Sequence, residues 1–501
     1  MISFKNFIQQ LYIDKDIYEI LYELFLENVI LRGKELMSEN KEKNKNIEVI
    51  TGDPKRAIRK LSVPMMVSML LIMMYNLADS IWVAGIGSGA LAAIGFITPL
   101  FMVLVGLGNG IGSGANSLIA RYIGANNYGQ ANNAGLHAII LSIVVSLIFT
   151  VIMTVLMVPI LQLMGAGDTI GYALDYGYII FGFLFIFVFS GVLSAIFRSE
   201  GDMRRATIAI AVTAILNIIL DPIFIYVLDL GIVGAAWATI ISCTMSILVM
   251  SYWIWGKKDL FLDLNPKNFK YNSGILIDTL QVAIPSTLEN VIFSALAIII
   301  NSMLVITAGT DAVAVYTASM RIVQLCMIPL IGIGTAVLTV AGVAYGAHNY
   351  KNLKIGHSYS IKIGFAVSIL LGAIMVIFSS QIATAFSYTN ASAGLSSQIA
   401  TAISILSFFV LAIPHGIMSS MMFQGVGKGT YSLIITLLRS LILESVLAYL
   451  FCFIFGWGVI GIYAGVVLGC FLGGTVGYVW AKFFIRKFEK ISRDRYDGVE
   501  S

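Results

Sequence analysis

The amino-acid sequence predicts an all-α membrane protein of twelve transmembrane helices, in two six-helix bundles related by a pseudo-twofold axis along the membrane normal. Three observations predict it. The 501 residues are 58% apolar and only 12% charged, whereas soluble proteins typically carry about 25% charged residues. Twelve apolar stretches are long enough to cross a bilayer, which takes about 20 residues each. The two halves of the chain also match each other, which indicates a duplicated unit.

The predicted transmembrane helices lie between polar or glycine-rich segments. In chain order they cover residues 61–86, 91–119, 134–160, 174–197, 206–228, 232–255, 275–307, 312–344, 358–382, 396–423, 431–455 and 459–484.

Lys and Arg residues set the predicted orientation. They gather in alternate connections, such as 198–205 and 256–270, whereas the other connections contain Asp168, Asp229 and Asp311 but no Lys or Arg. Because basic connections stay in the cytoplasm, we expect both termini there. The predicted organisation is a cytoplasmic extension (1–50), an N-lobe of spans 1–6 (51–255), a cytoplasmic linker (256–273), a C-lobe of spans 7–12 (274–485) and a cytoplasmic tail (486–501).

The internal repeat is offset by 221 to 227 residues. Pro64 corresponds to Pro285, "GANNY" at 124–128 to "GAHNY" at 346–350, and "GIVGAAWA" at 231–238 to "GVIGIYAG" at 458–465. Six spans separate equivalent positions, so the two halves have the same orientation. This is the parallel-repeat plan in which substrate binds between two bundles that rock alternately.

Two acids stand out in the first half, Asp79 on span 1 and Asp221 on span 5. The spans of this half contain no base to neutralise either. An unpaired buried carboxylate takes up a proton or binds a cation, so both residues are candidate ion-coupling sites. Asn217 and Tyr75 lie one helical turn before the two acids and share their faces.

Two prolines lie on the same two spans. Pro64, early in span 1, and Pro222, directly after Asp221, each lack a backbone N–H. We expect them to loosen or bend their helices, and bends of this kind suit a switching helix or a cation site.

The second half carries both signs of charge within its spans. Two readings stay open: the side chains pair as a structural network, or they form a secondary functional site. The residues are Glu289, Arg321, Arg439 and Glu444.

Several other classes of function are disfavoured. The four cysteines lie singly in apolar stretches, without metal-binding or disulfide spacing. The glycine-rich "GLGNGIGSG" (106–114) lies within span 2. A dinucleotide-binding motif follows a β-strand, and no strand precedes this segment, so we do not expect a dinucleotide site. With no catalytic cluster and no ATP-driving domain, we expect neither an enzyme nor a cofactor, and we expect an ion gradient to supply the energy.

Four segments resemble a known family: "GDPKRAIRKLSVPMM" before and in span 1, "YNLADSIWV" in span 1, "FRSEGDMRRA" after span 4 and "NIILDP" in span 5. Together with the two six-span halves, they are similar to the multidrug and toxin extrusion (MATE) transporters, in particular the DinF-like prokaryotic branch. The resemblance extends from about Gly52 to Lys487.

The resemblance implies an antiporter that exports cationic or amphipathic compounds in exchange for H⁺ or Na⁺. It implies an N-lobe coupling site at Asp79, Asn217, Asp221 and Thr239, with Na⁺ at the two acids if Na⁺ is the ion. It also implies cavity and substrate residues at Tyr75 and Tyr176, a bend at Pro64, and Ser194 in place of a cavity Asn. Other branches place a Glu on span 7 where this chain has Phe293.

The expected partners are the lipid bilayer and small organic cations or amphipathic drugs, with no nucleic acid. We expect a monomer in the cell membrane. The alternative function is a flippase of lipid-linked or polyanionic substrates on the same architecture. The acids of the N-lobe disfavour it, although Arg321 and Arg439 could serve such a substrate.

Overall fold

The computed structural model describes residues 45–386 and 393–497. The chain divides into two units, Met1–Glu48 and Val49–Ser501, and the second contains all the helices below. Most of the predicted N-terminal extension, residues 1–44, lies outside the described residues, as does the end of the predicted tail.

The N-lobe contains the first six spans. Spans 1 to 3 are α3 (Pro54–Ala84), α4 (Ser88–Gly124) and α5 (Tyr128–Leu163). After the short turn η1 (Gly167–Thr169), span 4 consists of α6 (Ile170–Gly182) and α7 (Leu184–Ser199), bent by 47°. Spans 5 and 6 are α8 (Met203–Pro222) with the π-turn η2 (Ile223–Val227), and α9 (Gly231–Ser251) with the π-turn η3 (Tyr252–Gly256).

The linker, which contains the turn η4 (Pro266–Asn268), leads into the C-lobe. Helix α10 (Ser273–Gly346) has 74 residues, but Ala308 and Gly309 leave helical geometry, and Gly309 has φ 75°. This break divides α10 into spans 7 and 8. The later elements are α11 (Tyr350–Ile377), α12 (Ser379–Phe386), η5 (Ala393–Leu395), α13 (Ser396–Ala412) bent by 41° from α14 (Pro414–Gly425), α15 (Gly429–Thr436), η6 (Leu437–Glu444), α16 (Ser445–Tyr449), η7 (Leu450–Ile454) and α17 (Gly458–Asp497).

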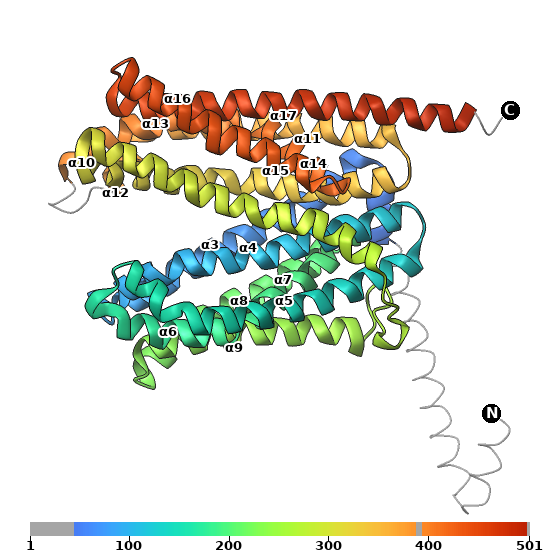
Figure 1. Ribbon diagram of the computed structural model, residues 1–501, viewed down its shortest axis with the longest axis horizontal. Coiled ribbons are helices and arrows are strands. Elements are labelled where there is room, and N and C mark those ends of the chain that lie inside the picture. The colour runs from blue at the N-terminus through green and yellow to red at the C-terminus, as the bar shows by residue number, and fades with distance from the viewer. Residues whose placement is uncertain (1–44, 387–392, 498–501) are drawn as a thin grey trace, which may run out of the picture. The chain divides into compact units, whose positions relative to one another are not determined.

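The predicted fold class is confirmed: within the described residues the chain is helical, and its twelve spans form two bundles (Figure 1). Each predicted span overlaps an observed one. The predicted connection 308–311 contains the observed break between spans 7 and 8. Several span ends differ, and the largest difference is at α17, which continues past the predicted end of span 12 to Asp497.

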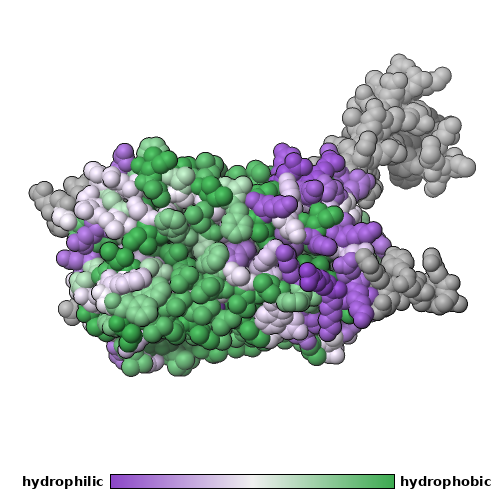
Figure 2. All heavy atoms as spheres, turned by 90° about the horizontal axis from the view of Figure 1, so that it is seen from above, coloured by the Kyte–Doolittle hydropathy of each residue, from purple (hydrophilic) through white to green (hydrophobic). Residues whose placement is uncertain are grey.

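The surface of the helical unit fits a bilayer. A broad hydrophobic band covers the middle of the face seen in Figure 2, and hydrophilic side chains gather most densely at one end of that face. On α5, for example, Val151 and Val155 are 64% and 69% exposed. Apolar side chains are exposed so extensively only where lipid covers them.

We call the hydrophilic end the basic end. It carries the connections around 125–127, 200–202, 257–272, 347–349 and 426–428, and it lies on the right in Figure 1. Polar side chains cap the helices that start there. Asp53 accepts the backbone N–H groups of Lys55 and Arg56 at the start of α3, and Asn127 and Asn349 cap α5 and α11. Such caps satisfy N–H groups that have no partner within the helix.

The sequence repeat reappears in backbone geometry. In the two "GA-x-N-Y" connections, Asn126 and His348 have nearly the same positive φ, 55° and 52°. The same holds for Gly231 and Gly458, which begin the last span of each lobe with φ 54° and 59°.

The two lobes touch at the basic end through α4 and α10. A Cβ on Gly124 would overlap the carbonyl of Val343, and a Cβ on Gly346 would overlap the carbonyl of Arg121. These two contacts exchange under the pseudo-twofold, because 121 corresponds to 343 and 124 to 346. We call this pair of glycines and carbonyls the glycine clasp. Beside it, the Ser117 hydroxyl donates to the carbonyls of Gln424 and Gly425, at 2.6 and 2.9 Å.

Candidate functional site

The predicted coupling residues of α8 and α9 form a connected polar group. The Asn217 side-chain amide donates to Asp221 Oδ1 at 3.1 Å and to Thr239 Oγ1 at 3.3 Å. Asp221 and Asn217 are buried, with 0% and 1% exposure. The structure therefore brings together the three residues that lie on spans 5 and 6.

Asp79 joins this group from α3, which packs against α8. Asp79 interacts electrostatically with Asp221, and Tyr176 of α6 interacts with both acids and with Tyr75. Three side-chain oxygens here are buried without a hydrogen-bond donor: Asp79 Oδ1, Asn217 Oδ1 and Asp221 Oδ2. Buried oxygens without donors are costly. Their chemistry fits a bound proton or a small hard cation.

Within the described part of the chain, neither acid forms an ion pair with a Lys, Arg or His. The N-lobe does hold a half-buried base, Arg198, which sequence inspection assigned to a loop. Arg198 lies in the last turn of α7 and donates to Ser194 Oγ at 2.8 Å. It adjoins the start of α8, whereas Asp221 lies near the other end of that helix, so Arg198 does not neutralise the site.

Two predicted site residues lie apart from the acids. Ser194 is buried beside Arg198 rather than beside Asp221.

Pro64 lies fifteen residues before Asp79 on the same helix, roughly 22 Å at the helical rise. The helix α3 runs through Pro64 without a break, and the Pro64 carbonyl accepts from Ser68 Oγ and Thr207 Oγ1 at 3.0 and 2.9 Å. Pro222, in contrast, directly precedes the π-turn η2 at the end of α8.

No hydrogen bond or ion pair in the described part of the chain joins the charged residues of the C-lobe into one network. Glu289 of α10 accepts from Ser432 Oγ at 2.6 Å and from the Gln424 amide at 3.2 and 3.3 Å. Arg439 and Glu444, both on η6, approach to 4.0 Å. Arg321 is exposed and takes no part in these contacts. Sequence inspection missed Ser432 and Gln424 because neutral polar residues in an apolar span give no charge signal.

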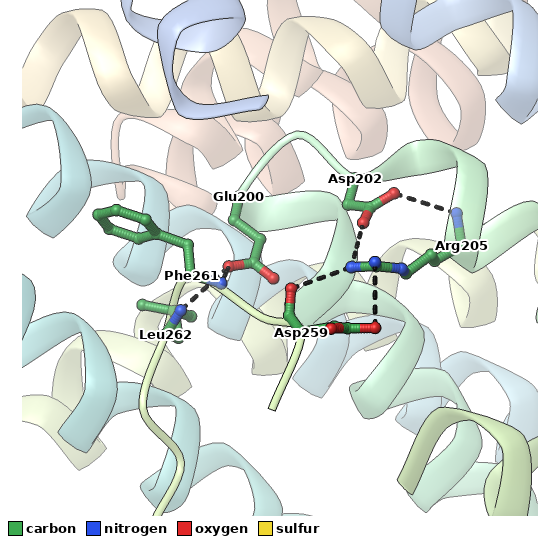
Figure 3. A network of polar contacts seen from close by, with 6 residues as sticks. All are labelled: Glu200, Asp202, Arg205, Asp259, Phe261 and Leu262. Carbon is green, nitrogen blue, oxygen red and sulfur yellow. Dashed lines mark hydrogen bonds and ion pairs between the residues drawn. The ribbon is translucent and has the colours of Figure 1, made fainter. Parts of the chain in front are cut away.

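A second polar network, at the basic end, also escaped sequence inspection (Figure 3). It joins the connection after α7 to the linker. Glu200 Oε2 accepts the backbone N–H groups of Phe261 and Leu262 at 2.9 and 3.2 Å. Arg205 bridges Asp202 at 3.1 Å and Asp259 at 3.4 Å. We call these contacts the linker latch, because they hold the segment that connects the two lobes.

Burial dominates the chemistry of Glu200. It is 3% exposed, and burial raises the pKa of its carboxyl to about 8, although the two N–H donors and Arg205 act in the opposite direction. Nearby Asp202 raises the pKa further. The linker latch therefore contains a group that titrates near neutral pH.

Comparisons with known proteins agree with this architecture. The family model MatE matches residues 64–223 and 285–450. The two matched segments begin at Pro64 and Pro285, the prolines that start the sequence repeat. The multidrug export protein MepA of Staphylococcus saprophyticus subsp. saprophyticus is 28% identical over 292 residues, 58% of this chain and 64% of that protein. MepA of Staphylococcus aureus is 27% identical over the same length. The matched part thus spans about 64% of these relatives.

Solved structures match over more of the chain. A crystal structure of MATE in complex with MaL6 is 37% identical and has a TM-score of 0.87, covering 89% of this chain and 99% of that one. A MOP superfamily transporter from Pyrococcus furiosus is 37% identical with a TM-score of 0.86 and the same coverage.

Proposed function

Because the chain belongs to the MatE family, we propose that it is a secondary antiporter that exports cationic or amphipathic compounds in exchange for H⁺ or Na⁺. The single observation that supports it most is the group of donor-less oxygens at Asp79, Asn217 and Asp221. The names of the MepA relatives, which export multiple drugs, support the substrate class.

In this proposal the basic end faces the cytoplasm, as the positive-inside rule requires. The lobes touch at that end, so the structure corresponds to a carrier closed toward the cytoplasm. Both termini are then cytoplasmic, the membrane is the cell membrane, and the carrier works as a monomer.

The exchange step follows from charge. A cationic substrate is attracted to Asp79 and Asp221 while both are ionised. A proton or Na⁺ from outside neutralises the same oxygens and weakens the attraction, so ion binding releases the substrate. The ion-loaded carrier then opens to the cytoplasm, where the ion leaves and a new substrate binds. Competition for one pair of acids couples the two fluxes.

Purified protein in proteoliposomes tests the proposal directly. We expect uptake of the cationic dye ethidium when a pH gradient or a Na⁺ gradient is imposed across the membrane, each in the absence of the other. Uptake under only one of them identifies the coupling ion. Equal dye movement with and without either gradient would refute antiport, and transport of an anionic lipid-linked sugar instead would favour a flippase.

A further inference from the structure

The last two spans of the N-lobe and of the C-lobe pack in the same way when the chain is shifted by 227 residues. A Cβ on Gly234 would meet the Phe224 carbonyl oxygen at 2.5 Å, and a Cβ on Gly461 would meet the Phe451 carbonyl carbon at 2.6 Å. The π-turns Ile223–Val227 and Leu450–Ile454 are equivalent under the same shift. This equivalence places Glu444 in the C-lobe where the N-lobe has Asn217.

Glu444 is a buried carboxyl with few donors. It is 1% exposed. Its Oε1 lies 3.5 Å from Ser440 Oγ and 4.0 Å from Arg439 Nε, and its Oε2 has no hydrogen-bond partner. The contact with Arg439 is therefore single and long rather than the bidentate pair that stabilises a buried carboxylate.

The charge balance of the C-lobe interior leaves one acid uncompensated. Arg439 interacts electrostatically with both Glu289 and Glu444. One base cannot neutralise two ionised carboxylates. Glu289 accepts hydrogen bonds from Ser432 and Gln424, which favours its ionised form, whereas Glu444 has one oxygen without any donor. Of the two acids, Glu444 is therefore the one whose carboxyl is protonated and neutral.

Several hydroxyl groups lie near Glu444 and could accept a hydrogen bond from its protonated carboxyl. Tyr316 of α10 interacts electrostatically with Glu444 and with Tyr463 of α17, and the two rings stack with centroids 5.9 Å apart. The hydroxyls of Tyr463 and of the adjoining Ser445 are buried without partners. The titratable and charged groups that interact with Glu444 are Arg439 of the same element, Tyr316 of α10 and Cys470 of α17. Glu289 and His415 interact with Arg439, and Tyr463 interacts with Tyr316.

We propose that Glu444 is a second protonation site, in the C-lobe, at the position that mirrors Asn217 of the N-lobe. The ligand is a proton and not a metal ion, because Arg439 at 4.0 Å would repel a second cation. The π-helical stretch Leu437–Glu444 leaves local backbone geometry irregular, as at many functional sites. The site is independent of the N-lobe acids and of the transported compound.

Infrared spectroscopy of the full-length protein in lipid, with ¹³C-labelled glutamate, tests whether Glu444 is protonated. The measurement does not depend on transport activity. A Glu200→Gln background removes a buried glutamate outside the spans whose pKa burial raises to about 8. We expect the carbonyl band of a protonated glutamic acid, and we expect Glu444→Gln to abolish it. The matched control Glu48→Gln, which removes an exposed carboxyl outside the spans, keeps the band.

A second variant guards against a folding defect in Glu444→Gln. Tyr463→Phe removes a hydroxyl and no charge, and we expect it to shift the frequency of the band without abolishing it. A spectrum without the band in the Glu200→Gln background would show that Glu444 is ionised and would overturn the proposal. Loss of the band on adding Na⁺ at constant pH would also overturn it, because the ligand would then be a metal ion.

Discussion

At the scale of single residues, Asp79 and Asp221 carry the proposed coupling. Asn cannot exchange a proton and carries no charge to attract a cation. We expect Asp79→Asn and Asp221→Asn each to lower gradient-driven ethidium uptake to the background of empty liposomes, with expression unchanged. The matched control is Asp175→Asn, which removes an exposed carboxyl from α6 and should transport normally. We expect Glu289→Gln to reduce uptake less than either N-lobe variant.

Glu200 makes the linker latch dependent on pH. Its pKa is about 8 in the docked state and ordinarily 4.5, so between these values the docked latch binds more protons than the undocked one. Raising the pH through this window therefore favours undocking, by at most about tenfold per pH unit. We expect amide exchange at Phe261 and Leu262, corrected for its intrinsic pH dependence, to quicken as pH rises toward 8.

Glu200→Gln should abolish this pH dependence, because the amide oxygen still accepts an N–H but does not titrate. Asp263→Asn is the control, since it removes an exposed acid from the same linker and should leave the pH dependence intact. Exchange that stays pH-dependent in Glu200→Gln would show that another group controls the latch.

At the scale of the helices, a glycine row on α17 fixes the packing of span 12. Cβ atoms on Gly461, Gly465, Gly469 and Gly473 would each collide with backbone of the η6–η7 segment. Such small-residue rows let two helix backbones approach closely in a membrane. We expect Gly465→Val to destabilise the protein by more than about 1–3 kcal/mol, seen as a lower melting temperature in detergent. Gly95→Val, where nothing lies within 4 Å of the new Cβ, should change little.

The same scale shows what sequence could predict. Apolar length and basic connections located all twelve spans, because a bilayer imposes both. They also placed the connection between spans 7 and 8 at 308–311, where the structure has its break at Ala308 and Gly309. They could not show that α3 continues through Pro64, since a proline in a membrane helix is compatible with a bend or with a straight course.

For the site, the sequence predicted the residues that carry charge and missed those that only donate hydrogen bonds. Asn217 and Asp221 share one helix face, as their spacing predicted, whereas the grouping of Asp79 with them is what the family resemblance implied. Gln424 and Ser432, which hold Glu289, come from other spans, and only the packing of helices brings them near. The exposure of Arg321 likewise depends on helix rotation, which residue counting does not determine.

At the scale of the whole molecule, the glycine clasp closes the basic end. Because each glycine touches a carbonyl of the other lobe, a side chain at either position blocks closure. We expect Gly124→Val and Gly346→Val to lower transport at least tenfold and to expose a cysteine introduced at Ser117, now buried between the lobes, to a reagent added at the cytoplasmic face. Gly129→Val, in open space at the same end, should do neither. A buried Ser117→Cys in the clasp variants would contradict this role.

The most direct test of the central claim is proton release on substrate binding. Purified protein in weakly buffered detergent is mixed with ethidium while a pH-sensitive dye reports free protons. The account predicts that binding acidifies the medium, or displaces bound Na⁺ if Na⁺ is the ion, and that the Asp79→Asn/Asp221→Asn double variant does neither. Equal release of ions by the double variant and the unchanged protein would contradict it.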